Sequence, residues 1–152
     1  MALPLLGSPA PDFTLPSTAG TSVTLSRLRG RPLLLAFFPA AFTSVCTSEM
    51  CAFRDDWAGY EALGTLVLPI SVDGVPCLRE FKARERLTLD LLSDFRREAS
   101  RAYGTLLEDR YLSTRAYFIV DREGLLRGAH REDTPGQRRE TAELLANLRA
   151  VA

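Results

Sequence analysis

The sequence predicts an α/β domain of three layers, in which helices flank a mixed β-sheet on both faces. Continuous apolar runs at 33–38, 65–71 and 116–120 are each typical of a strand buried on both faces, and they alternate with amphipathic helical segments. A turn followed by a further strand at 125–130 adds an antiparallel edge. Alternation with an antiparallel edge indicates a mixed sheet covered by helices.

Length and charge limit the class of protein. The chain has 152 residues, of which 46% are apolar, and a formal net charge of zero. This length fits one domain, 1–152, which can bury a core without disulfide or metal staples. A balanced charge argues against binding to nucleic acid or to a membrane surface, since both need a basic excess. We see neither a spanning segment nor a basic secretory leader, so we expect a cytoplasmic protein.

The first part of the chain predicts a short hairpin and then the first buried strand. Segments 12–15 and 23–25 have the composition of short strands, and the polar stretch 17–22 fits the turn between them. Pro39 ends the strand at 33–38, because proline cannot donate to a sheet ladder.

A long helix is expected from Ser44 to about Leu63. Large apolar or sulfur-containing side chains recur there at spacings of three and four, so they form a single stripe. The stripe consists of Cys46, Met50, Phe53, Trp57 and Tyr60.

Two more helices are expected in the middle of the chain. Asp73 is expected to cap a helix at 75–86, and Asp94 to cap another that stops at Gly104. Segment 87–92 between them is expected to be a short strand or an extended stretch.

The end of the chain predicts a hairpin and a last helix. A turn at 121–124 joins the strand at 116–120 to its partner at 125–130. Thr134 followed by Pro135 fits a cap with proline at the first helical position, so we expect a helix from there to the end of the chain.

The cysteines indicate redox or catalytic use. Cys46, Cys51 and Cys77 are too few, and odd in number, for a secreted disulfide scaffold. With a single histidine and no CxxC pair, neither a zinc site nor a general disulfide oxidoreductase is expected.

Cys46 has the surroundings of an activated thiol. It stands in the first turn of the predicted helix, where free N–H groups and the helix dipole favour a thiolate. Thr43, three residues earlier, can present its hydroxyl beside the sulfur, and Pro39 shapes and shields the pocket. An activated sulfur, a hydroxyl and oriented N–H donors are what attack on an O–O bond requires.

This segment resembles the active-site signature of the peroxiredoxins, Pro-x-x-x-(Thr/Ser)-x-x-Cys, with Pro39, Thr43 and Cys46 in the signature positions. Residues 46–55 are similar to the bacterioferritin-comigratory, or peroxiredoxin Q, branch, which reads Cys-Thr-x-Glu-x-Cys-x-Phe-Arg-Asp there. Two further segments, 7–15 and 115–121, resemble the family's N-terminal segment and the segment that carries its catalytic arginine.

The resemblance implies a thioredoxin-like fold and thiol-dependent reduction of hydrogen peroxide and organic hydroperoxides, without a cofactor or a metal. Cys46 would be the peroxidatic nucleophile, which peroxide oxidises to a sulfenic acid. Thr43 would hydrogen-bond the peroxide and the thiolate. Arg115 would hold the thiolate and polarise the peroxide, and Glu49 would orient Arg115 through an ion pair.

Cys51 matches the resolving cysteine of the branch, and the resemblance implies that thioredoxin or a similar dithiol reduces the Cys46–Cys51 disulfide. An intact helix holds the two residues about 140° apart and about 7.5 Å along its axis. A disulfide needs Cα atoms within roughly 7 Å and converging Cβ atoms, so the helix must first unwind.

Two features depart from the family pattern. Ser44 and Val45 replace the common Pro-Gly before the cysteine, and a β-branched valine is stiffer than glycine. Some members carry the resolving cysteine in a later helix, where this chain has Lys82, with Cys77 five residues earlier.

Other interpretations remain open at this point. Cys46 could serve a one-cysteine peroxidase that an external thiol recycles, or a thioredoxin-fold redox sensor or holdase without turnover. Thr43 could be only a helix cap, Arg115 only a surface charge and Cys77 a bystander. A monomer or a weak homodimer is expected.

Overall fold

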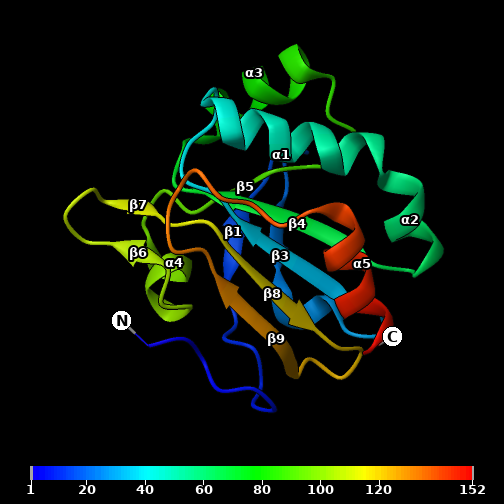
Figure 1. Cartoon of the computed structure of the whole chain (residues 1–152). Helices are drawn as coiled ribbons and strands as arrows, with labels where there is room; N and C mark the ends of the chain where they lie inside the picture. The colour runs from blue at the N-terminus through cyan, green and yellow to red at the C-terminus, as the bar shows by residue number, and fades with distance from the viewer. Residues whose placement is uncertain (1, 152) are drawn as a thin grey trace.

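The computed structural model describes residues 2–151 and is built on a five-stranded mixed sheet with the strand order β5-β4-β3-β8-β9 (Figure 1). The central strand β3 (Leu33–Phe37) pairs in parallel with β4 (Leu66–Ser71), which pairs in parallel with β5 (Leu92–Ser93). On its other side, β3 pairs antiparallel with β8 (Ala116–Val120), and β8 with β9 (Leu126–Arg131). The predicted α/β class and antiparallel edge are confirmed.

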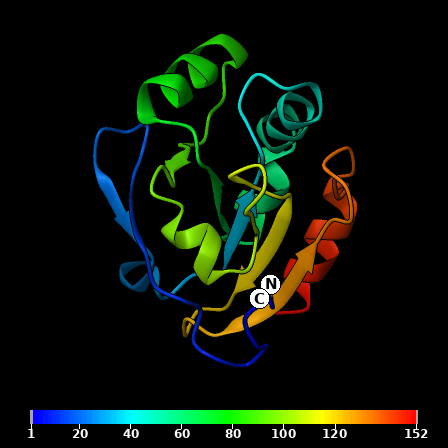
Figure 2. The same ribbon diagram turned by 90° about the vertical axis from the view of Figure 1, so that its left-hand side faces the viewer.

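Side chains of β3 divide the core into two layers. Leu34 and Ala36 point into one hydrophobic cluster, and Leu33, Leu35 and Phe37 point into the other, as the two-residue period of a strand requires. The first cluster is covered by α1 (Ser44–Asp55), α2 (Trp57–Ala62), α3 (Val75–Glu85) and α5 (Thr141–Arg149). The second is covered by α4 (Glu98–Ala102), the hairpin of β1 (Thr14–Pro16) and β2 (Ser22–Thr24), and the 3-10 helix Leu25–Leu28 (Figures 1 and 2).

The long helix predicted from Ser44 to about Leu63 is divided into α1 and α2 at Asp56. Aspartate favours helix ends because its side chain competes for backbone hydrogen bonds, and two aspartates stand together here. The predicted apolar stripe nevertheless holds across the break. Its members Cys46, Met50, Phe53 and Tyr60 are buried, and Trp57 packs against them.

Asp73 does not cap α3, which corrects the prediction for this helix. Gly74 is the N-cap residue. The Asp73 carboxylate instead accepts hydrogen bonds from the Ala41 N–H and from the Ser71 hydroxyl, each at 2.8 Å. Asp73 therefore fastens the loop after β3 to the end of β4.

Asp94 holds the start of α4 from outside the helix. Its carboxylate accepts hydrogen bonds from the N–H groups of Ala99 and Ser100 at 3.1 and 2.7 Å, while Arg97 occupies the N-cap position. Gly104, at φ +70°, follows the C-cap residue Tyr103 and confirms the predicted stop.

The last helix begins later than predicted. α5 starts at Thr141, and the expected cap Thr134 and proline Pro135 lie in a loop. Tertiary contacts hold this loop, because a side-chain nitrogen of Arg115 donates to the Pro135 carbonyl at 3.1 Å and the Arg139 N–H donates to the Tyr117 hydroxyl at 3.1 Å. These contacts override the local helix-start signal.

Short elements account for the remaining differences. The segment expected at 87–92 is a strand only at Leu92, although its leucines are buried. The hairpin of β6 (Leu106–Leu107) and β7 (Leu112–Ser113) was not predicted, because two-residue strands have no readable period.

Among residues 2–151, none of the helices combines the length and apolarity needed to cross a membrane.

Candidate active site

The loop between β3 and α1 carries the start of the site. Phe38 extends the sheet by donating its N–H to the Ile70 carbonyl at 2.9 Å, and half-buried Pro39 follows. Phe42 adopts φ +65°, unusual for a bulky residue, and its half-exposed ring packs edge-on against Phe81 of α3. This loop, fastened by Asp73, sets the position of the first turn of α1.

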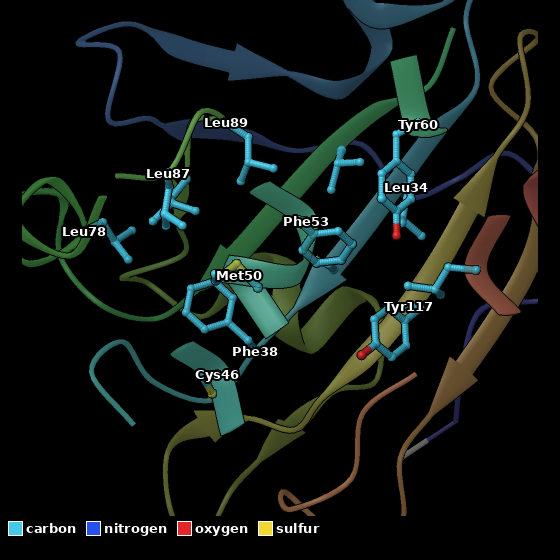
Figure 3. Close-up of a cluster of buried hydrophobic side chains, with 14 of the residues drawn as sticks. Leu34, Phe38, Cys46, Met50, Phe53, Tyr60, Leu78, Leu87, Leu89 and Tyr117 are labelled. Atoms are coloured by element: carbon cyan, nitrogen blue, oxygen red, sulfur yellow. The ribbon is translucent and has the colours of Figure 1, made fainter. Parts of the chain in front are cut away.

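Cys46 is buried in the first turn of α1 and belongs to the hydrophobic cluster that also contains Met50 and Tyr117 (Figure 3). The Arg115 Nη2 donates a hydrogen bond to the Cys46 Sγ at 3.1 Å. A guanidinium is a permanent cation, so this contact places a fixed positive charge beside the sulfur. The geometry therefore makes Cys46 the candidate nucleophile of this site.

Arg115 also forms a buried ion pair with Glu49, in which Nη1 and Oε1 are 2.8 Å apart. Their side chains are 1% and 2% exposed. Burial raises the pKa of Glu49, and the Arg115 charge and the Tyr117 hydroxyl oppose that rise. Burial acts to lower the pKa of Arg115, but the negative charges of Glu49 and Cys46 outweigh it and the pKa is raised. Arg115 thus contacts both side chains at once.

Tyr117 completes this arrangement, and sequence reasoning missed it. Its hydroxyl donates to the Glu49 Oε2 and accepts a hydrogen bond from the Arg139 N–H. Burial, followed by the charge of Glu49, raises the pKa of Tyr117 above its ordinary range. A signal was present, because residues two apart on a strand share a face, and Tyr117 stands two residues after Arg115.

Thr43 lies at the N-cap position of α1, and its side chain is exposed. Its hydroxyl donates to the Ala40 carbonyl at 2.7 Å. Within residues 2–151, the α1 N-terminus receives no side-chain capping bond from it. Contact of Thr43 with a bound peroxide stays a prediction.

The other two thiols lie beside carboxylates, and all three cysteines are free. The Cys51 Sγ donates to the Glu85 Oε2 at 3.7 Å, and the Cys77 Sγ to the Asp73 Oδ1 at 3.9 Å. Burial raises the pKa of both thiols and the neighbouring carboxylates raise it further, while the Arg54 charge only partly opposes the rise at Cys51. Both residues are therefore held as thiols in this conformation.

Comparison with known proteins shows the family to which the chain is related. The profile of the AhpC/TSA family matches residues 6–129. The putative peroxiredoxin bcp of Coxiella burnetii is 35% identical over 127 residues, which are 80% of this chain and 84% of that protein. The chloroplastic peroxiredoxin Q of Oryza sativa subsp. japonica is 33% identical over 146 residues, which are 93% of this chain and 67% of that protein.

The crystal structure of peroxidoxin BcpB from Mycobacterium tuberculosis has a TM-score of 0.85 at 29% identity and covers 97% of both chains. This similarity extends over almost the whole fold and confirms the thioredoxin-like architecture that the resemblance implied. The chain belongs to the AhpC/TSA family, in its peroxiredoxin Q (bcp) branch of thiol peroxidases.

Proposed function

We propose that Cys46 is the peroxidatic nucleophile for hydrogen peroxide and organic hydroperoxides. The thiolate attacks one peroxide oxygen and the O–O bond breaks. The sulfur keeps that oxygen as a sulfenic acid, and the other oxygen takes up a proton and leaves as water or an alcohol. The observation that carries this proposal is the hydrogen bond from the Arg115 guanidinium to the Cys46 Sγ at 3.1 Å.

The residues around Cys46 divide the work. Arg115 stabilises the thiolate and the charge that develops on the leaving oxygen, and Glu49 orients Arg115. Thr43 rotates its exposed hydroxyl from the Ala40 carbonyl to the bound peroxide. Pro39, half-buried in the loop, shields the pocket without offering a competing N–H.

Cys51 then resolves the sulfenic acid. Its thiol displaces water from the Cys46 sulfur, and a disulfide forms. Because both cysteines lie in the continuous helix α1, the first turns must unwind before the sulfur atoms can meet. The start of α1 favours this unwinding. The Thr43 hydroxyl bonds the Ala40 carbonyl, so among the described residues the first turn of α1 has no side-chain cap to stabilise it.

The remaining steps concern partners. Thioredoxin or a similar dithiol reduces the Cys46–Cys51 disulfide by exchange, which returns both thiols. We further infer a cytoplasmic protein of one domain, 1–152, that acts as a monomer or weak homodimer, without nucleic-acid or membrane partners. Three cysteines, too few and odd in number for a secreted disulfide scaffold, support this compartment.

Mass spectrometry with peptide mapping after one equivalent of hydrogen peroxide tests this proposal. We expect a Cys46–Cys51 link in the wild type and in the matched control Cys77→Ser, and a stable Cys46 sulfenic acid in Cys51→Ser. A sulfenic acid in the wild type with Cys51 and Cys77 free would show a one-cysteine mechanism, and a 46–77 link would give Cys77 the resolving role. A Cys46 that stays reduced would contradict the peroxidatic role.

A further inference from the structure

Tyr117 is a buried polar residue in direct contact with the proposed machinery, yet it has no part in the steps above. It belongs to β8, and its ring lies in the same cluster as Cys46 and Met50 (Figure 3). Its hydroxyl touches Glu49 on one side and the Arg139 backbone on the other. A chain of contacts thus runs from the loop before α5 through Tyr117, Glu49 and Arg115 to the Cys46 sulfur.

The hydrogen-bond inventory fixes the direction of each bond in this chain. A tyrosine hydroxyl has one proton to donate, and here the Arg139 N–H occupies an acceptor position on its oxygen. The hydroxyl proton is therefore directed at the Glu49 Oε2, while Arg115 donates to the Oε1. Two donors aimed at the two oxygens suit a carboxylate, because a protonated Glu49 would place a third donor where its neighbours mainly donate.

We propose that Tyr117 is a positioning residue for Cys46: its hydroxyl, fixed from behind by the Arg139 N–H, keeps the buried Glu49 ionised and in place. Glu49 in turn aligns Arg115 with the Cys46 sulfur. The inference rests on the proposed peroxidatic role of Cys46 and adds a residue that acts through two others.

The charged and titratable groups around Glu49 come from several elements. Tyr117 faces Glu49 from β8, and Arg115 faces it from the position just before β8. Arg138 lies in the loop before α5, and Tyr60 lies in α2. Cys46, on the same helix as Glu49, shares Arg115 with it. Burial raises the pKa of Glu49 in this setting, whereas Arg115, Tyr117 and Arg138 lower it. Loss of the Tyr117 hydroxyl removes the contribution of one of these three residues.

Tyr117→Phe is therefore expected to move the protonation of Glu49 to higher pH. Once Glu49 is protonated, Arg115 loses its charge partner and its alignment with Cys46. The second-order rate of Cys46 oxidation, divided by the thiolate fraction, should then fall as the pH is lowered. This fall, the acid limb of the pH profile, should lie about one pH unit higher in the variant than in the wild type. At pH values below the acid limb, the variant should react about tenfold more slowly than the wild type.

The experiment measures the second-order rate of Cys46 oxidation by hydrogen peroxide between pH 4.5 and 8.5. Each rate is divided by the thiolate fraction from ultraviolet absorbance, which separates Glu49 from Cys46. Tyr103→Phe is the matched control, because Tyr103 is a buried tyrosine of the other core layer whose hydroxyl donates to the Pro11 carbonyl at 2.6 Å. We expect the acid limb to move in Tyr117→Phe and not in Tyr103→Phe.

An unmoved limb, or a loss of rate by the same factor at every pH, would overturn the inference while leaving the peroxidatic role of Cys46 intact. Failure of peroxide to oxidise Cys46 in the wild type would instead overturn the proposed function. Glu49→Gln provides a second test if Tyr117→Phe does not fold. Its normalised rate should be low and without the acid limb, and a limb like that of the wild type would contradict the inference.

Discussion

The chemistry of single residues centres on one cation that two buried acidic groups share. Arg115 lies 3.1 Å from the Cys46 sulfur and 2.8 Å from the Glu49 carboxylate. Two hydrogen-bonding directions of one planar fork make this possible, and lysine has no equivalent geometry. Removal of either Arg115 or Glu49 leaves the other without its ion-pair partner in a buried site.

Arg115→Met is expected to destabilise the protein by about 3–5 kcal/mol at neutral pH, because the buried Glu49 loses its partner. The pKa of Glu49, already raised by burial, should rise further. A carboxyl group whose folded pKa lies above its unfolded value favours the fold at low pH, and this stability is lost as pH rises through the folded pKa. Urea unfolding should therefore show a smaller loss at pH 5 than at pH 8; equal losses at both would contradict the pairing.

Sequence alone indicated much of this site, but not all of it. Cys46 could be picked as the candidate nucleophile from its position after a buried strand, and the Arg115–Glu49 ion pair from the family resemblance. The structure brings these three residues together. Tyr117 was missed because its partner is distant in sequence, and because an aromatic residue in a buried strand is ordinarily core.

Among the elements, α1 needs two different conformations in the proposed cycle. It must be helical to place Cys46 beside Arg115, and it must unwind to bring Cys51 to Cys46. Its far end is tied to α3, because Cys51 and Arg54 both donate to Glu85. Unwinding should therefore start from the N-terminal turn.

Val45→Gly should speed the conversion of sulfenic acid to disulfide, because glycine weakens the first turn of α1 by roughly 0.3–0.5 kcal/mol relative to valine. The matched control is Ala58→Gly in α2, which imposes a larger helix cost, about 1 kcal/mol, on an exposed site outside α1. Rapid-quench trapping of the sulfenic acid measures the rate. Equal rates in Val45→Gly and wild type, or equal acceleration by Ala58→Gly, would count against unwinding of the first turn.

Element predictions held where the pattern was dense and failed where tertiary contacts decide. The strands at Leu33–Phe37 and Ala116–Val120 could be predicted because both of their faces are buried, so every residue in them is apolar. The start of the last helix was misplaced because Thr134 and Pro135 form a valid local signal. Contacts from Arg115 and Tyr117, which no local pattern contains, hold that loop instead.

At the scale of the whole molecule, one carboxylate ties together segments that cover opposite faces of the sheet. The Asp90 Oδ1 accepts hydrogen bonds from the Lys82 Nζ of α3 at 2.6 Å and from the Thr18 hydroxyl of the N-terminal hairpin at 2.7 Å. Thr18 also accepts the Leu91 N–H at 3.1 Å. Lys82 thus has a structural partner at the position where some family members carry a cysteine.

Asp90→Asn should cost at most about 1 kcal/mol at pH 7, since the pair is partly exposed. Burial acts to raise the pKa of Asp90, but the hydrogen bonds from Lys82 and Thr18 outweigh it and the pKa is lowered. A lowered folded pKa gives stability that is present above the unfolded value and lost as pH falls through the folded one. Urea unfolding of both proteins should therefore converge below about pH 4, and a constant difference down to pH 3 would contradict the tie.

The role of the Arg115–Cys46 pair is tested by the second-order rate of Cys46 oxidation by hydrogen peroxide in Arg115→Lys. The rate can be followed by the fluorescence of Trp57, the single tryptophan, which packs against the cluster that contains Cys46. Arg127→Lys, at an exposed arginine paired with Asp121, is the matched control. We predict a loss of about 100-fold in Arg115→Lys, equivalent to about 2.7 kcal/mol, and wild-type rates in Arg127→Lys. A wild-type rate in Arg115→Lys would contradict the role of the Arg115–Cys46 pair.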